Sequence, residues 1–185
     1  MIGVILAGGQ SSRFGGVPKG LQLLRGLPLV GHVHASLSMV CTEVFIECVP
    51  GSAYEGWGVP CLSADAGHAG LGPLAGMLAG LKAAGERPVA FAPCDMPLLP
   101  PPLYERLGQE PAGAYSVSPR GAEPLVCVLP AKAMAHIERA LSGPTVPRVV
   151  DVLDAAGVTA VRIREDWPFE NVNTPEDLER LSASF

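Results

Sequence analysis

The chain has 185 residues, of which 48% are hydrophobic and 17% charged, and its formal net charge is −5. This composition excludes a disordered chain, and the length suits one hydrophobic core, so we expect a single domain over residues 1–185. The chain is acidic and has no Lys/Arg cluster, so nothing in its composition supports a nucleic-acid partner. No apolar run is long enough for a membrane span, so no membrane partner is expected. The five cysteines are well separated and contain no Cys-x-x-Cys pair, as in reduced thiols of a cytoplasmic protein.

Short apolar runs alternate with longer helical patterns along the chain. The runs predict strands at 2–6, 43–49, 60–63, 88–92, 114–117, 124–129 and 158–163. The helical patterns cover 28–41, 72–84, 100–107, 131–141, 147–156 and 174–181. This alternation predicts an α/β fold with a mostly parallel sheet and helices on both faces.

In such sheets ligands bind beyond the carboxyl ends of the strands, which directs attention to the loops at 7–19, 64–71 and 93–99. The first loop contains four glycines (Gly8, Gly9, Gly15, Gly16) and two cations, Arg13 and Lys19. Glycines let backbone N–H groups approach phosphate oxygens, and the two cations add the charge that a polyphosphate needs. The alternative is an ordinary Gly/Ser-rich turn with two solvated cations. The loop fits neither the P-loop pattern nor Gly-x-Gly-x-x-Gly.

Two aspartates follow other predicted strands. Asp95, in Pro93-Cys94-Asp95-Met96-Pro97, is a candidate ligand for Mg²⁺, which is held by few carboxylates together with substrate phosphates and water. Asp65 is a candidate contact for a base or ribose, or for a metal through water. The alternatives are a turn or cap residue for Asp95 and a solvated loop residue for Asp65. Cys94 is better explained as a small buried residue than as a nucleophile, and Glu123 is either structural or directed at an acceptor.

The segment 169–177 combines a helix start with two unexplained amides. Thr174 at the N-cap, Pro175 at the first helical position and acids in the first turn are typical of a helix N-terminus. This cap leaves Asn171 and Asn173 without a structural reason, and they are candidate ligand contacts.

Together these motifs resemble the molybdenum cofactor guanylyltransferase (MobA) family. The resemblance rests on Leu6-Ala7-Gly8-Gly9 with Arg13 and Lys19, on the runs 72–76 and 93–97, and on the run 171–177. It covers the chain from residue 2 to about residue 181. It implies a Rossmann-like three-layer α/β/α sandwich and the transfer of GMP from GTP to the Mo-molybdopterin cofactor, with release of pyrophosphate.

The resemblance also implies a role for each matching residue. The backbone of Leu6, Ala7, Gly8 and Gly9 would contact guanine and phosphates, Lys19 the α-phosphate, and Asp65 the nucleoside. Asp95 would ligate Mg²⁺ and Arg13 would hold the leaving pyrophosphate, whereas Asn171 and Asn173 would face the molybdopterin. Candidate protein partners are molybdenum insertion proteins and apoenzyme chaperones. Pro18 stands where many members carry an acidic residue, and Phe14 where Met is common.

Three other functions remain open on the sequence. A CTP-using cytidylyltransferase would share the fold, and a nucleotide-sugar pyrophosphorylase is usually longer. A GTP-binding chaperone that delivers the cofactor without catalysis would not require both Lys19 and Asp95.

Overall fold

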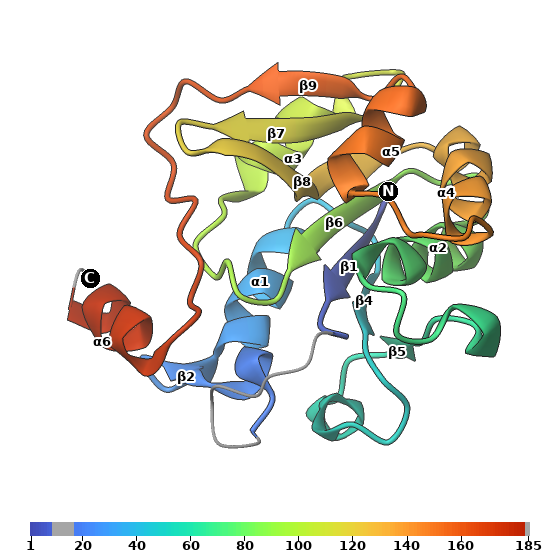
Figure 1. The fold of residues 1–185 in the computed structure, drawn as a ribbon. Coiled ribbons are helices and arrows are strands. Elements are labelled where there is room, and N and C mark those ends of the chain that lie inside the picture. Colours follow the sequence, from blue (N-terminus) through green and yellow to red (C-terminus); the bar gives the residue numbers. More distant parts are fainter. Residues whose placement is uncertain (9–16, 184–185) are drawn as a thin grey trace.

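A seven-stranded sheet forms the centre of the computed structural model, which describes residues 1–8 and 17–183 (Figure 1). The strand order in this part of the chain is β5-β4-β1-β6-β8-β7-β9. The strands are β1 (Ile2–Leu6), β4 (Val44–Glu47), β5 (Cys61–Leu62), β6 (Val89–Pro93), β7 (Ala114–Ser118), β8 (Gly121–Leu129) and β9 (Thr159–Arg162). β8 runs antiparallel to both of its neighbours, and the other pairings are parallel. The prediction of a mostly parallel sheet is therefore confirmed.

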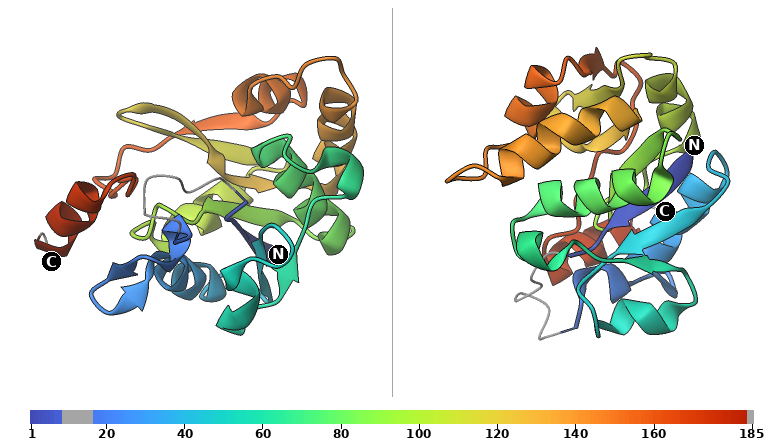
Figure 2. Two further views of the ribbon diagram at one scale, coloured as in Figure 1. Left: turned by 60° about the horizontal axis from the view of Figure 1, so that its bottom comes forward. Right: turned by 90° about the vertical axis from the view of Figure 1, so that its right-hand side faces the viewer.

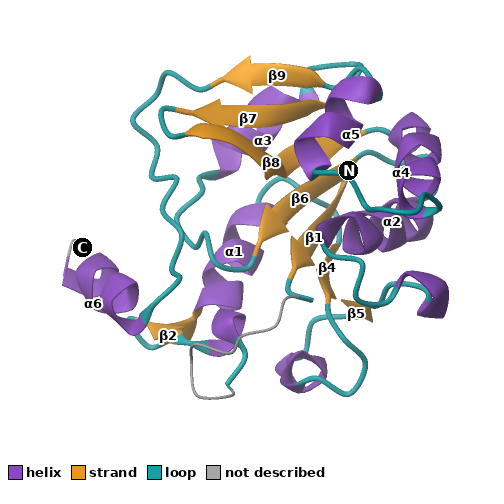
Figure 3. Ribbon diagram, viewed as in Figure 1, coloured by secondary structure: helices purple, strands orange, loops and turns teal. Residues whose placement is uncertain are grey.

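Helices cover both faces of this sheet (Figures 2 and 3). The helices that cover it are α1 (Leu29–Ser38), α2 (Pro73–Ala84), α3 (Pro101–Gly108), α4 (Met134–Leu141) and α5 (Val149–Ala155), and a further helix, α6 (Pro175–Ala183), lies near the C-terminus. α1 and α3 pack with Ile5 in one hydrophobic cluster, whereas α2, α4 and α5 pack with Val4 in the other. Every residue of β1 is buried, because its successive side chains enter opposite cores. That is why the predicted strand is a continuous apolar run.

Each predicted strand and helix corresponds to an observed element, with shifted ends. The helix predicted from residue 28 begins at Leu29, because Pro28 ends a short strand, β3 (Leu27–Pro28). The region predicted as a helix from residue 131 begins as a 3₁₀ turn over Ala131–Ala133 before α4. No helix in the described part of the chain is long and apolar enough to cross a membrane.

A small hairpin of β2 (Leu23–Leu24) with β3 was not predicted. Its two connecting residues, Arg25 and Gly26, have φ of 51° and 82°, as in the tight turns that match strand twist. Leu24 packs with Val172 and Leu181 in a third hydrophobic cluster. This cluster holds α6 beside the hairpin, away from the main sheet (Figure 1).

Candidate active site

Three parallel strands end level with one another at the edge of the sheet where the candidate residues lie. In the sheet register, Leu6 of β1 is opposite Glu47 of β4 and Pro93 of β6. Past these ends the backbones stay joined, since Ala7 N–H donates to Glu47 O (2.8 Å) and Cys94 N–H to Leu6 O (3.1 Å). This places the start of the glycine-rich loop directly beside Asp95.

Residues 9–16 of that loop lie outside the described residues. The sequence assigned phosphate contacts to Gly9 and Arg13, and both fall in the range 9–16. Their roles therefore stay predictions. Gly8 is described, and it is exposed at the end of β1.

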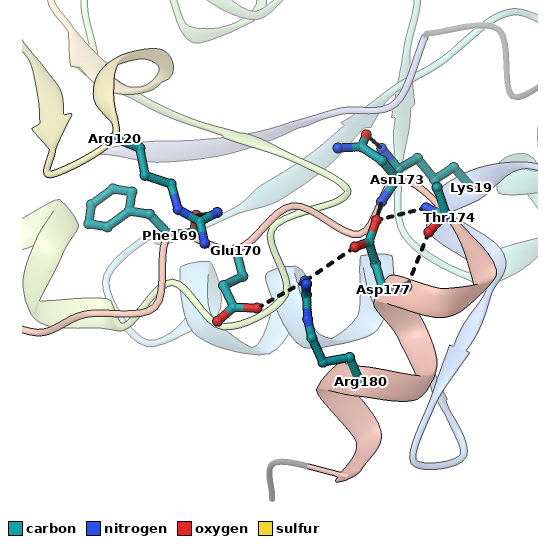
Figure 4. Close-up of polar contacts among 8 residues, drawn as sticks. All are labelled: Lys19, Arg120, Phe169, Glu170, Asn173, Thr174, Asp177 and Arg180. Atoms are coloured by element: carbon teal, nitrogen blue, oxygen red, sulfur yellow. Dashed lines mark hydrogen bonds and ion pairs between the residues drawn. The ribbon is translucent and has the colours of Figure 1, made fainter.

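Lys19, Asp95 and Asn173 meet in one cluster. Lys19 Nζ lies 2.5 Å from Asp95 Oδ2 and 2.6 Å from Asn173 Oδ1 (Figure 4 shows the latter contact). The side chains of Lys19 and Asp95 are 17% and 21% exposed, so the ion pair is partly shielded but open to a ligand. The structure thus brings together residues that are 76 and 154 positions apart in the chain.

The position of Lys19 depends on the glycine that follows it. Gly20 is buried, and its N–H donates to the hydroxyl of Tyr54 (3.0 Å). A Cβ at Gly20 would lie 2.7 Å from that hydroxyl and 3.2 Å from Cβ of Cys94. A side chain here would therefore require Tyr54, Cys94 or the Lys19 turn to shift. Neither Gly20 nor Tyr54 was identified from the sequence, because their contact joins two distant loops.

The segment before α6 reaches the same place through its backbone. Val172 is buried, and its N–H donates to the carbonyl oxygen of Asp95 (2.9 Å). Asn171 and Asn173 flank this anchor but do different things. Asn171 lines a cavity beside Asp95, whereas Asn173 contacts Lys19. Asn173 thus has a partner on the nucleotide side, which the sequence did not indicate.

The predicted helix start is confirmed and is stronger than a simple cap. Asp177 Oδ2 accepts the N–H groups of Asn173 (2.9 Å) and Thr174 (3.0 Å), and Asp177 N–H donates to Thr174 Oγ1 (3.2 Å; Figure 4). These N–H groups lower the pKa of the Asp177 carboxyl. Asp177 binds the backbone N–H of Asn173, whereas the side-chain amide of Asn173 contacts Lys19, so this contact does not disturb the cap.

A cavity of about 460 Å³ opens on the other side of Asp95. It lies between the end of β6, the start of β8 and the start of α5. Its lining residues are Pro93, Asp95, Met96, Ala122, Glu123, Pro124, Leu125, Val126, Arg148, Val149, Val150 and Asn171.

A buried glutamate at the end of β4 was missed from the sequence. Glu47 is 8% exposed, and burial raises the pKa of its carboxyl, opposed by the N–H of Gly8. The carboxyl packs against α2, where a Cβ at Gly76 would lie 2.6 Å from Glu47 Cδ. This contact explains why residue 76 is a glycine. A glutamate inside an otherwise apolar strand was the one available signal.

Two other candidates have local explanations. Asp65 is exposed and forms an ion pair with Lys82 of α2 (2.8 Å), which lowers the pKa of Asp65. Its predicted contact with a nucleoside would require this pair to open. Cys94 is buried, and burial raises the pKa of its thiol to about 12, so it is not a thiolate nucleophile at neutral pH.

Comparison with known proteins agrees with this geometry. The sequence profile described as "MobA-like NTP transferase domain" matches residues 3–160. The molybdenum cofactor guanylyltransferase of Cupriavidus metallidurans is 37% identical, over 95% of this chain and 91% of that protein. The enzyme of the same name from Acidiphilium cryptum is also 37% identical, over 97% and 93%. The chain therefore belongs to the family of MobA-like NTP transferases.

Solved structures show the same fold at low sequence identity. Molybdopterin-guanine dinucleotide biosynthesis protein A from Archaeoglobus fulgidus superposes with a TM-score of 0.79 at 24% identity, covering 100% of this chain and 98% of that one. A 2-C-methyl-D-erythritol 4-phosphate cytidylyltransferase from Thermus thermophilus has a TM-score of 0.69 at 15% identity, covering 98% and 96%. The predicted fold, a three-layer sandwich of the nucleotidyltransferase type, is confirmed.

Proposed function

We propose that this protein is a molybdenum cofactor guanylyltransferase, which transfers GMP from GTP to the Mo-molybdopterin cofactor and releases pyrophosphate. One observation carries the proposal. Lys19, Asp95 and Asn173 converge beside the carboxyl end of β1, where the glycine-rich loop begins. The choice of substrates rests on the relatives at 37% identity, which are named for this activity.

The chemistry requires positioning and charge neutralisation more than covalent help. The terminal phosphate of the acceptor attacks the α-phosphorus of GTP in line, and pyrophosphate leaves. No general base is needed, because a phosphate monoester is largely ionised at neutral pH. Lys19, held by Asn173, would offset charge on the α-phosphoryl oxygens.

The residues present fit a divalent metal shared with substrate. In the described part of the chain no group of three or more His, Cys, Asp or Glu side chains could hold a metal ion. Of the described residues, Asp95 would hold Mg²⁺, which commonly takes one or two carboxylates and completes its shell with phosphates and water. Bound Mg²⁺ would supply Lewis-acid stabilisation of phosphate charge. Lys19, which contacts Asp95 and Asn173, would be positioned to reach the α-phosphate.

The remaining assignments are part of the proposal. The backbone of Leu6, Ala7 and Gly8, with Gly9, would contact guanine and phosphates, and Arg13 the leaving pyrophosphate. Asp65 would contact the nucleoside after leaving Lys82. Asn171 would face the acceptor, since it lines the cavity beside Asp95.

The proposal extends to the surroundings of the enzyme. The five cysteines are free thiols, which supports a reducing cytoplasm as its location. Molybdenum insertion proteins and apoenzyme chaperones are the proposed protein partners, because they would supply the acceptor and receive the product.

A nucleotide panel tests the function directly. The protein is incubated with Mg²⁺, molybdopterin-loaded acceptor and GTP, CTP or UTP, and pyrophosphate release is measured. Turnover with GTP well above CTP and UTP supports the proposal. Preference for CTP would identify a cytidylyltransferase, and GTP binding without pyrophosphate release would identify a non-catalytic chaperone.

A further inference from the structure

The cavity beside Asp95 has the character of a site for a planar heterocycle. Most of its lining is apolar, and its polar side chains are few: Asp95 and Asn171 near the Lys19 cluster, with Glu123 and Arg148 elsewhere on its wall. Apolar walls with a few polar groups are typical of small-molecule sites, and about 460 Å³ lies within their usual size range.

Glu123 lines this cavity, and its carboxylate has hydrogen-bonding capacity that its neighbours do not fill. Its Oε1 lies 3.2 Å from Ser118 Oγ, but that hydroxyl also lies 3.3 Å from Gly121 O and has only one proton to donate. Arg120 makes no ion pair with Glu123 within the described residues. Its guanidinium instead donates to Phe169 O (3.4 Å; Figure 4). The carboxylate therefore has room for two further donors.

Partial burial makes this unused capacity costly. Glu123 is half-buried, and burial raises the pKa of its carboxyl. The hydrogen bond from Ser118 and the charge of Arg120 oppose this rise, and the charge of Asp95 adds to it. A desolvated carboxylate gains most from a ligand that brings N–H donors to it. Its two coplanar oxygens match two parallel N–H groups, the same geometry by which a guanidinium binds a carboxylate.

We propose that Glu123 recognises the pterin ring of the acceptor, by accepting hydrogen bonds from the ring N3–H and the 2-amino group. This inference rests on the proposed function, which supplies a pterin as acceptor. The apolar walls would pack against the ring faces, and the acceptor's phosphate would extend toward Asp95 and Lys19.

The strand order distinguishes this role from recognition of guanine, which presents the same pair of donors. Glu123 lies on β8, whereas the glycine-rich loop follows β1, and β6 lies between the two strands. GTP held at the end of β1 and pterin held at β8 would thus lie on opposite sides of Asp95. This is the arrangement that transfer between them requires.

Binding of free pterins tests the inference without relying on turnover. Titration calorimetry with 6-hydroxymethylpterin and with its 2-oxo analogue, 6-hydroxymethyllumazine, measures the contribution of the 2-amino donor. We expect the protein to prefer the pterin by about 10-fold, the scale of one charge-assisted hydrogen bond, and Glu123→Gln to lose this preference. In the transfer assay, Glu123→Gln should raise the acceptor KM by about 10-fold while the Kd for GTP stays within about twofold.

Two further variants control the result. Glu105→Gln makes the same charge change on an exposed part of α3. It should leave the pterin preference and the acceptor KM unchanged. Glu123→Asp keeps the carboxylate but shortens it by one methylene, and it should recover part of the pterin preference. It also tests the inference if the glutamine variant melts early.

Several outcomes would overturn the inference. An unchanged pterin preference in Glu123→Gln would remove Glu123 from the acceptor site. A weakened affinity for GTP would assign it to the nucleotide, and an altered Mg²⁺ dependence would assign it to the metal. If the unmodified protein releases no pyrophosphate from GTP and loaded acceptor, the proposed function fails. The pterin titration still tests whether Glu123 binds a pterin.

Discussion

Replacing Asn173 by alanine removes the amide oxygen that lies 2.6 Å from Lys19 Nζ. Lys19 also contacts Asp95, at 2.5 Å. During transfer Asp95 would be engaged with metal, and Asn173 would still help to orient the ammonium. The loss should therefore be felt in the transition state more than in the ground state.

The magnitude follows from the kind of contact. Hydrogen bonds to charged groups contribute about 1.5–3 kcal/mol, and the exposure of Asn173 argues for the lower end. A loss of about 1.5 kcal/mol corresponds to a kcat lowered about 10-fold. The fold should not suffer, because Asp177 binds the backbone N–H of residue 173 and not its side chain. The melting temperature should stay within about 2 °C, since a loss near 0.5 kcal/mol has little effect in a domain of this size.

Asn171→Ala is the matched control, since it is the same substitution two residues away. Asn171 lines the cavity, so its variant should raise the acceptor KM and leave kcat nearly unchanged. Steady-state kinetics with GTP and acceptor varied separately, beside a thermal melt, measure all of these effects. Identical profiles for the two variants, or a fall in melting temperature of Asn173→Ala that accounts for its activity loss, would refute the reasoning.

Four further predictions concern the same region. Asp95→Asn should lower kcat at least about 10²-fold, and near-normal turnover at limiting Mg²⁺ would exclude Asp95 as the metal ligand. Lys19→Ala should lower kcat more than it raises the KM for GTP, while Arg13→Ala should also weaken GTP binding; equal profiles would contradict this division. Burial raises the pKa of Glu47, so the folded protein holds this proton more tightly than the unfolded chain, and stability falls as pH rises from the unfolded pKa through the folded one. Denaturant unfolding of Glu47→Gln should therefore show a smaller loss of stability between about pH 4 and pH 7 than the unmodified protein, and parallel pH curves would refute it. Gly76→Ala places a Cβ 2.6 Å from Glu47 Cδ and should destabilise by about 1–3 kcal/mol, much of it relieved in a Glu47→Ala background.

Local sequence patterns were sufficient for the strands of the main sheet, for helices α1 to α6 and for part of the site, but not for the β2–β3 hairpin. Buried parallel strands are continuous apolar runs, and Thr174 with Asp177 marks a helix start through contacts three residues apart. Lys19 and Asp95 were identifiable because each lies in a loop that follows a strand, and such loops gather at one edge of a parallel sheet. That residues 1–185 form one domain stays a prediction.

Tertiary structure alone decided how these parts meet. The contact between Asn173 and Lys19 joins residues 154 positions apart. It exists because the backbone N–H of Val172 donates a hydrogen bond to the carbonyl oxygen of Asp95. The strand pattern did not show what surrounds Glu47, because its neighbours Gly8 and Gly76 lie far from it in the chain. The antiparallel insertion of β8, which brings Glu123 to the cavity, likewise depends on strand order. Strand order is set by the packing of distant segments against one another, and no pattern within a single segment records it.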